Sequence, residues 1–180
     1  MTMTLRFAIA AAAVAAATLA GCNSSDTIEA RNESAESVAQ KVAKSDIRPN
    51  PGKWESKMTL EKIEMPGMPA EMQGMMKQQL GKVTTSTSCL TPDEANRPDA
   101  KFFQPGDASG CTYKTFNMGG GKIDAEMVCE EGGMQQNMKM NGTYSGDAYT
   151  MHVSSEGKLE GQTMAMAMTI ESRRVSECDE

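Results

Sequence analysis

The chain has 180 residues, with 18 basic and 24 acidic side chains and a formal net charge of −6 at neutral pH. An acidic chain without a block of lysine or arginine argues against nucleic acid as a partner. Aromatic residues make up only 4% of the chain, whereas methionine occurs 17 times. We therefore expect methionine and aliphatic side chains to supply most of its hydrophobic core.

Residues 1–21 have the features of a secretory signal. One basic residue, Arg6, precedes a run of thirteen apolar or small residues from Phe7 to Leu19. This run is too short for a membrane-spanning helix, which needs about 20 apolar residues. Leu19-Ala20-Gly21-Cys22 resembles the lipobox of bacterial lipoproteins, in which the signal is cut before an acylated cysteine. The alternative is a secreted protein with a chance cysteine.

The lipobox resemblance implies a palmitate-type lipid anchor on Cys22 and a location in the periplasm. The following residue, Asn23, is not aspartate, which resembles lipoproteins directed to the outer membrane. Removal of residues 1–21 leaves 159 residues with 17 basic and 24 acidic side chains, a net charge of −7. We therefore expect one domain held on the membrane by its acyl chains and not by a basic surface.

Residues 22–47 are predicted to form a flexible tether, because they are rich in Ser, Glu, Ala and Asn and contain no aromatic residue. Thr27–Lys44 favours only a transient helix, since its apolar stripe of Ile28, Ala35 and Val42 is too thin to dock firmly. Arg48-Pro49-Asn50-Pro51-Gly52 breaks any helix, so residues 48–180 are expected to form the folded domain.

Within this domain the sequence predicts an all-β fold. Segments rich in Thr, Val, Ile, Met and Tyr are separated by Gly, Asp, Asn or Ser, as is typical of strands. They are Lys53–Glu64, Lys82–Leu90, Cys111–Met118, Lys122–Glu130, Gln136–Ser145, Ala148–Ser155 and Met164–Arg173. We expect an antiparallel meander of about six to eight strands that forms a small curled sheet or barrel, with one short helix after the first strand.

Four cysteines remain beside Cys22, an even number that predicts two disulfides in an oxidising compartment. Their spacing is too wide for the close pairs of a zinc site. If Gly119–Gly121 forms a three-residue hairpin loop, residues whose numbers sum to 240 face each other, and Cys111 and Cys129 are such a pair. The sequence thus predicts Cys111–Cys129 and, by elimination, Cys89–Cys178.

Several motifs together resemble a bacterial family of small exported proteins, the DUF3617 domain. They are Pro51-Gly52-Lys53-Trp54-Glu55, Cys89-Leu90-Thr91-Pro92, the pair Cys111 and Cys129, Arg173-Arg174, Cys178 and a Met- and Pro-rich insertion. The resemblance covers about residues 47–178 and departs at Ser176, where the family often has glycine. It implies an exported protein of undetermined function, with no catalytic residues to carry over.

Catalysis is poorly supported by the sequence. His152 is the only histidine, and the alternation around it places it opposite the apolar Met151 and Val153, toward solvent. A general base needs a nucleophile and an orienting group nearby, and no such motif is present. Asp124 and Glu126 are interpreted as a solvated acidic pair. We expect no enzyme and no cofactor, although a hydrolytic site built from carboxylates stays open.

The segment Met65–Leu80 is the most unusual part of the chain. Pro69 suits the first turn of a helix that ends before Gly81 and carries one apolar stripe. Three interpretations compete: core packing, a lid over an apolar cavity, and soft thioether ligands for Cu(I) or Ag(I). The lid residues are Met65, Met68, Met72, Met75 and Met76, and the alternative metal ligands are Met65, Met68, Met72 and Met75.

The sequence as a whole therefore predicts a lipid-anchored periplasmic protein with a non-catalytic role. The expected partner is an apolar small molecule or another envelope protein, bound beneath or beside the methionine-rich segment. Copper or silver binding by the same methionines is the alternative, weakened because copper sites usually include histidine or free cysteine.

Overall fold

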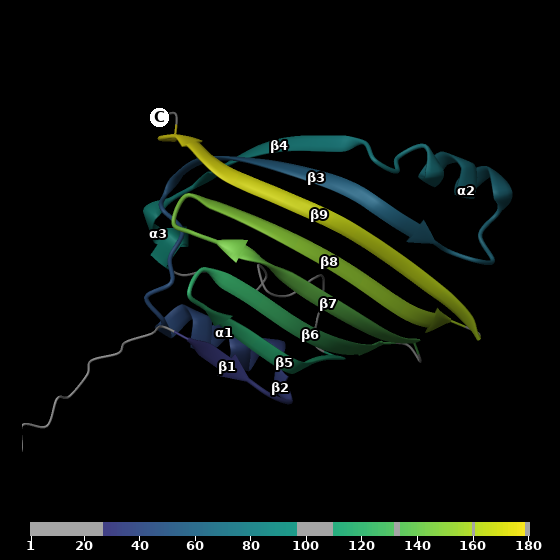
Figure 1. The fold of residues 1–180 in the computed structure, drawn as a ribbon, viewed down its shortest axis with the longest axis horizontal. Helices are drawn as coiled ribbons and strands as arrows, with labels where there is room; N and C mark the ends of the chain where they lie inside the picture. Colours follow the sequence, from purple (N-terminus) through teal and green to yellow (C-terminus); the bar gives the residue numbers. More distant parts are fainter. Residues whose placement is uncertain (1–26, 97–109, 132–133, 160, 179–180) are drawn as a thin grey trace, which may run out of the picture.

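The computed structural model describes residues 27–96, 110–131, 134–159 and 161–178 (Figure 1). In these residues the chain forms nine strands and three helices. They are β1 (Ile28–Ala30), β2 (Glu33–Ser34), α1 (Ala35–Lys44), β3 (Gly52–Glu64), α2 (Ala70–Lys77), β4 (Val83–Leu90), α3 (Pro92–Asn96), β5 (Cys111–Gly119), β6 (Lys122–Glu131), β7 (Met134–Tyr144), β8 (Ala148–Leu159) and β9 (Gln162–Ser176).

All described strands belong to one antiparallel sheet with the order β1-β5-β6-β7-β8-β9-β3-β4, and β2 also pairs with β5. Strands β5 to β9 follow one another as a meander, while β3 and β4 add to the far side of β9. The sheet does not close, because β1 and β4 remain as its edges. The predicted all-β curled sheet is thus confirmed in its open form, and each of the seven predicted strands is present.

The two faces of the sheet differ in chemistry, because strand side chains alternate between faces. On β8 and β9, Met151 lies opposite Ile170 and Val153 opposite Met168, all on one face. The intervening residues are polar: His152 lies opposite Thr169 on the other face. One face is therefore methionine-rich and apolar, and the other is solvated, as antiparallel sheets permit.

The hairpin of β5 and β6 brings Cys111 opposite Cys129, with a Cα–Cα distance of 4.0 Å, and the two are joined by a disulfide. The pairing is as predicted, but the loop is not. Gly120 and Gly121 form a two-residue turn, with φ of 56° and 75°, instead of a three-residue loop. A bulge at Lys114 adds one residue to β5 and restores the cysteine register.

The second predicted disulfide, Cys89–Cys178, is also present, with a Cα–Cα distance of 5.6 Å. It joins the end of β4 to the residues that follow β9. Because β3 lies between β4 and β9 in the sheet, the bond ties together three neighbouring strands at the same end of the molecule.

The predicted tether over residues 22–47 is wrong for its described part. Ile28 and Ala30 pair through β1 with β5 and are 7% and 4% exposed. Helix α1 begins at the capping residue Ser34 and buries Val38 and Val42 against β5 and β6. The stripe that looked too thin is sufficient, because it needs to cover only one end of an already apolar sheet.

The hydrophobic core lies between α1 and the apolar face of β5 and β6. Tyr113, Phe116 and Met127 are its largest fully buried side chains. The rings of Tyr113 and Phe116 meet edge to face, with centroids 5.2 Å apart, an arrangement that aromatic pairs favour. Strands β7, β8 and β9 extend the same face away from α1.

We predict that Val38→Ala lowers the free energy of unfolding by roughly 1–3 kcal/mol, because truncation of this fully buried side chain leaves a cavity in the core. Gln40→Ala on the exposed side of the same helix should change it little. Urea unfolding of both variants measures the difference. Equal, negligible shifts would show that α1 does not contribute to the core.

Burial raises the pKa of Tyr113 to about 12, above the unfolded value of about 10. The neutral phenol is therefore favoured in the folded state, and the stability it contributes is present below pH 10 and declines as pH rises toward about 12, by at most about 3 kcal/mol. Tyr113→Phe should show a smaller decline than wild type when urea unfolding is compared between about pH 9 and about pH 11.5. The same decline in both proteins would contradict this assignment.

Candidate functional site

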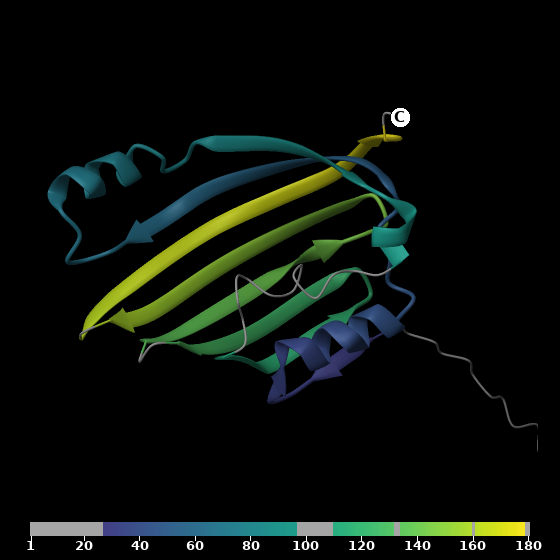
Figure 2. The ribbon, with the colours of Figure 1, turned by 180° about the vertical axis from the view of Figure 1, so that it is seen from behind.

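A cavity of about 490 Å³ lies on the apolar face of the sheet, at the end where α1 finishes. Its walls come from the end of α1, from β3 and β4 near one edge of the sheet, from β5 and β6 near the other edge, and from β8 and β9 between them. A single cavity can be lined from strands this far apart only because the sheet curls around it. The apolar face is thus the concave face, seen with α1 against one end in Figure 2.

The lining of this cavity is mainly apolar. Its aliphatic, methionine and aromatic members are Val42, Ile47, Trp54, Leu90, Met118, Ile123, Tyr144, Tyr149 and Met151. The volume falls within the about 300–1,000 Å³ of typical small-molecule pockets, which are likewise lined by apolar and aromatic groups with few polar ones.

Three polar groups of the cavity, those of Arg48, Ser56 and Ser172, bond to the protein itself. The hydroxyl groups of Ser56 and Ser172 lie 2.8 Å apart across β3 and β9. The Arg48 guanidinium donates to the carbonyls of Val42 and Ala43, at 3.3 and 2.8 Å, and so caps the end of α1. The remaining interior presents little charge, which suits an apolar ligand.

Glu94 of α3 stands at the rim of the cavity, on the exposed side. It accepts hydrogen bonds from the backbone N–H and the hydroxyl group of Thr91, each at 2.8 Å. These bonds favour the charged form and hold the pKa of Glu94 below its usual value. The carboxylate therefore caps the start of α3 together with Thr91.

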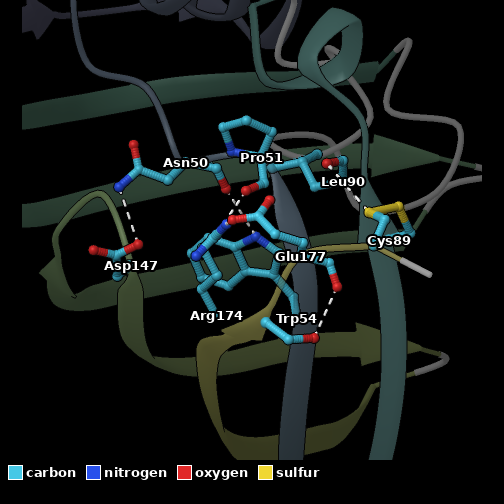
Figure 3. A network of polar contacts seen from close by, with 10 residues as sticks. Asn50, Pro51, Trp54, Cys89, Leu90, Asp147, Arg174 and Glu177 are labelled. Carbon is cyan, nitrogen blue, oxygen red and sulfur yellow. Dashed lines mark hydrogen bonds and ion pairs between the residues drawn. A yellow bond between two sulfur atoms is a disulfide. The ribbon is translucent and has the colours of Figure 1, made fainter. Parts of the chain in front are cut away.

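A network of polar contacts holds the rim at the start of β3 (Figure 3). Trp54 Nε1 donates to the Asn50 carbonyl at 3.0 Å, and Arg174 Nε donates to the Pro51 carbonyl at 2.6 Å. Asn50 also donates through Nδ2 to Asp147 at 3.0 Å, which joins the β7–β8 turn to the same cluster. The network fixes the position of Trp54, whose ring lines the cavity.

Gly52 is required by this network. Its φ is +142°, and a Cβ atom there would lie 2.5 Å from Arg174 Nε and 2.6 Å from the carbonyl oxygen of Ser176. Arg174 also pairs with Glu177, beside Cys178 and its disulfide. The motifs Pro51–Glu55, Arg173-Arg174 and Cys178, separate in the sequence, thus meet as one structural cluster.

The methionine segment does not cover this cavity. Helix α2 lies at the opposite end of the sheet from α1 and α3, beyond the ends of β3 and β4 (Figures 1 and 2). It contains no buried residue, and Met72 and Met75 are 49% and 62% exposed. Helix α2 therefore neither packs into the core nor lies over this cavity, because it follows the far end of β3, away from the curled end. The hypothesis that the methionines cover a ligand stays a prediction.

Three of the predicted lid residues line a smaller hollow. Met68 and Met76 are half-buried and line a space of about 360 Å³ at the far end of β3, together with Ile63 and Met65. The thioether hypothesis for Cu(I) or Ag(I) stays a prediction. Among the described residues, no three His, Cys, Asp or Glu side chains gather in a way that could hold a metal ion.

His152 lies where the sequence placed it, on the polar convex face. Its Nδ1 is 2.8 Å from the hydroxyl group of Thr169, which in turn donates to Glu61 at 2.5 Å. All three residues lie on the outer surface of the sheet, away from the cavity. Asp124 also lies exposed on this face, where β6 pairs with β7.

The predicted lipidation site, Cys22, lies outside the described residues. An apolar cavity was among the interpretations, but its place between α1 and the curled sheet was not predicted, and the docking of α1 on the sheet was missed. Two signals could have located it. Trp54 is the single tryptophan of the chain and sits in the Pro-Gly motif, and Val38 and Val42 share one face of α1 at a spacing of four.

Fold and cavity together describe an all-β protein whose open sheet curls around an apolar cavity with a disulfide at the rim. The model of the DUF3617 family, described as a protein of unknown function, matches residues 49–178, so the chain belongs to this family. The resemblance seen in the motifs is thereby confirmed. No curated protein and no solved structure matches the chain. Of the described helices, none is long and apolar enough to cross a membrane.

We predict that Gly52→Ala lowers the free energy of unfolding by about 1–3 kcal/mol, because the added Cβ meets Arg174 and the backbone at a strained φ. Gly74→Ala is the matched control, since nothing lies within 4 Å of a Cβ at this position in α2. It should be neutral or slightly stabilising. Thermal and urea unfolding compare the two, and an unaffected Gly52→Ala would remove the structural role assigned to the network.

Proposed function

We propose that this protein is a lipid-anchored periplasmic protein of the bacterial envelope that binds an apolar molecule in the cavity between α1 and the curled end of the sheet. The observation that carries the proposal is the cavity itself, about 490 Å³ in volume, with an apolar lining drawn from seven elements of the fold. Arg48 bonds to the backbone and Ser56 to Ser172, so these groups are already engaged and the interior offers mainly apolar contact area.

The role is non-catalytic. Catalysis would need a nucleophile, a base and an orienting group that converge on a bound substrate. In the described residues, the chain's single histidine faces solvent on the convex side, and the rim carboxylate Glu94 is held by Thr91. The lipid on Cys22 and the location at the outer membrane belong to the same proposal and are supported by the lipobox resemblance.

We expect the apolar fluorophore N-phenyl-1-naphthylamine to bind in the cavity and to quench the emission of Trp54 by energy transfer. Ser88 lines the cavity from β4 and is exposed, so Ser88→Phe should place a ring in the mouth without straining the core. The variant should weaken binding about tenfold or more, a change of about 1.4 kcal/mol.

Thr87→Phe supplies the matched control. Thr87 is the neighbouring residue of β4, equally exposed, and its side chain points to the opposite face of the sheet. It should bind the fluorophore as wild type does. Absence of binding to wild type, or equal binding by both phenylalanine variants, would refute the cavity as the ligand site.

A further inference from the structure

The cavity continues into an apolar trough along the concave face. From Ser172 at the cavity, the side chains of β9 that point to this face are Ile170, Met168, Met166 and Met164. They are half-buried, and their partners on β8 include the half-buried Met151 and Val153. On β3, Met58 lies opposite Ile170 and Leu60 opposite Met168, and Met58 is 46% exposed.

Among the described residues of β3, β8 and β9, no charged side chain points into the stretch between Ser172 and Met164. The charged residues of this stretch occupy the alternate positions, on the convex face. Arg173, which also lies on that face, pairs with Glu55 at 3.0 Å, and Arg174 lies beyond the stretch, at the rim of the cavity. The floor of this stretch therefore consists mainly of methionine and aliphatic side chains. Methionine surfaces adapt to ligands of varied shape, and a floor without charge excludes a ligand with an ionic group along its length.

The dimensions of the trough suit a hydrocarbon chain. The eight steps along β9 from Ser172 to Met164 extend about 27 Å at roughly 3.4 Å per residue. One leaflet of a bilayer holds its acyl chains within about 15 Å, half of the hydrocarbon core. The trough is therefore long enough for one extended acyl chain, and the cavity gives its end a deeper enclosure.

The chain outside the described structure places this cavity near a membrane. Ile28 follows Cys22 by six positions in the sequence, so a lipid on Cys22 is attached at most about 20 Å from the start of β1. Ile28 pairs with Met118, and Met118 lines the cavity. A protein anchored at Cys22 thus holds the cavity end of its sheet next to the bilayer, and the trough leads away from it.

From this geometry we propose that the ligand is an acyl chain of a lipid taken from the bilayer that holds the Cys22 anchor, lying in the cavity and along the trough on β3, β8 and β9. This inference rests on the proposed function and names its ligand class. It differs from binding of a compact apolar molecule, which would need the cavity and not the trough.

The test uses the full-length lipoprotein in vesicles of phosphatidylethanolamine and phosphatidylglycerol with a small fraction of phosphatidylethanolamine that carries a diazirine on its acyl chain. After irradiation, peptide mapping should locate lipid adducts on β3 and β9, at the concave positions Met58, Met166 and Met168. Adducts confined to the residues that precede β1, or none on the sheet, would overturn the proposal, since the anchor alone would then contact the bilayer.

Matched variants separate the trough from general effects of charge. Met58→Glu places a carboxylate on the trough at a position that is already exposed, so the fold should tolerate it. It should reduce the adducts about tenfold, because an acyl chain would have to desolvate the charge. Thr85→Glu, exposed on β4 and opposite Lys57 on the convex side, and Met58→Leu should both keep wild-type labelling. Equal labelling of all four proteins would refute the trough as the site.

Two further measurements show whether a negative result contradicts the acyl-chain inference or the proposed function. A long Gly/Ser insertion after Asn23 should lower labelling from the bilayer while leaving N-phenyl-1-naphthylamine binding unchanged, because only access to the membrane is altered. Unchanged labelling would contradict the short-tether argument. If the fluorophore binds beside Trp54 but no adduct forms on the trough, the acyl-chain inference fails and the proposed function stands. If the fluorophore does not bind, the proposed function itself fails.

Discussion

One apolar sheet face that must be shielded from water determines the rest of this structure. The alternation of β5 to β9 puts methionine and aliphatic side chains on a single face, and each 100 Å² of such surface left in water forgoes about 2.5 kcal/mol of stabilisation. The sheet curls, and α1 covers the part of this face that β5 and β6 form. Among the described residues, the part of this face that α1 does not reach forms the cavity and the trough, so the candidate binding site is a continuation of the core.

The family motifs have a structural explanation that fits a binding protein. Gly52, Trp54 and Arg174 meet at the rim, where backbone carbonyls of the Pro-rich segment accept from the tryptophan and the arginine. The Cys89–Cys178 disulfide closes the same corner. These contacts keep one end of the curled, open sheet in shape without filling its interior. A pocket held in this way is preorganised for the apolar ligand that we propose. The motifs therefore form the frame of the cavity.

The methionine-rich segment shows how local pattern and tertiary position differ. The expected helix forms as α2, but its place at the tip of the β3–β4 hairpin leaves Met72 and Met75 in solvent. Methionines with a role in the concave face came instead from the strands, above all Met164, Met166 and Met168 of β9. The clustering in sequence marked a feature of composition, whereas the alternation in β9 marked the apolar face. The periodicity of the methionines in β9 indicated their place in the structure better than the density of methionines in the segment before β4.

The sequence by itself determined the strands, the short helix and both disulfides, because side-chain alternation, turn residues and cysteine spacing are local or depend on one hairpin. Even there the tertiary structure corrected the detail, since a bulge at Lys114 compensates for the shorter turn at Gly120. Only the tertiary structure decided that residues 28–44 pack on the sheet, that α2 stands apart and that a cavity exists. These three features depend on how the sheet curls and on which elements meet although many residues separate them in the sequence. A local sequence pattern does not encode such long-range contacts.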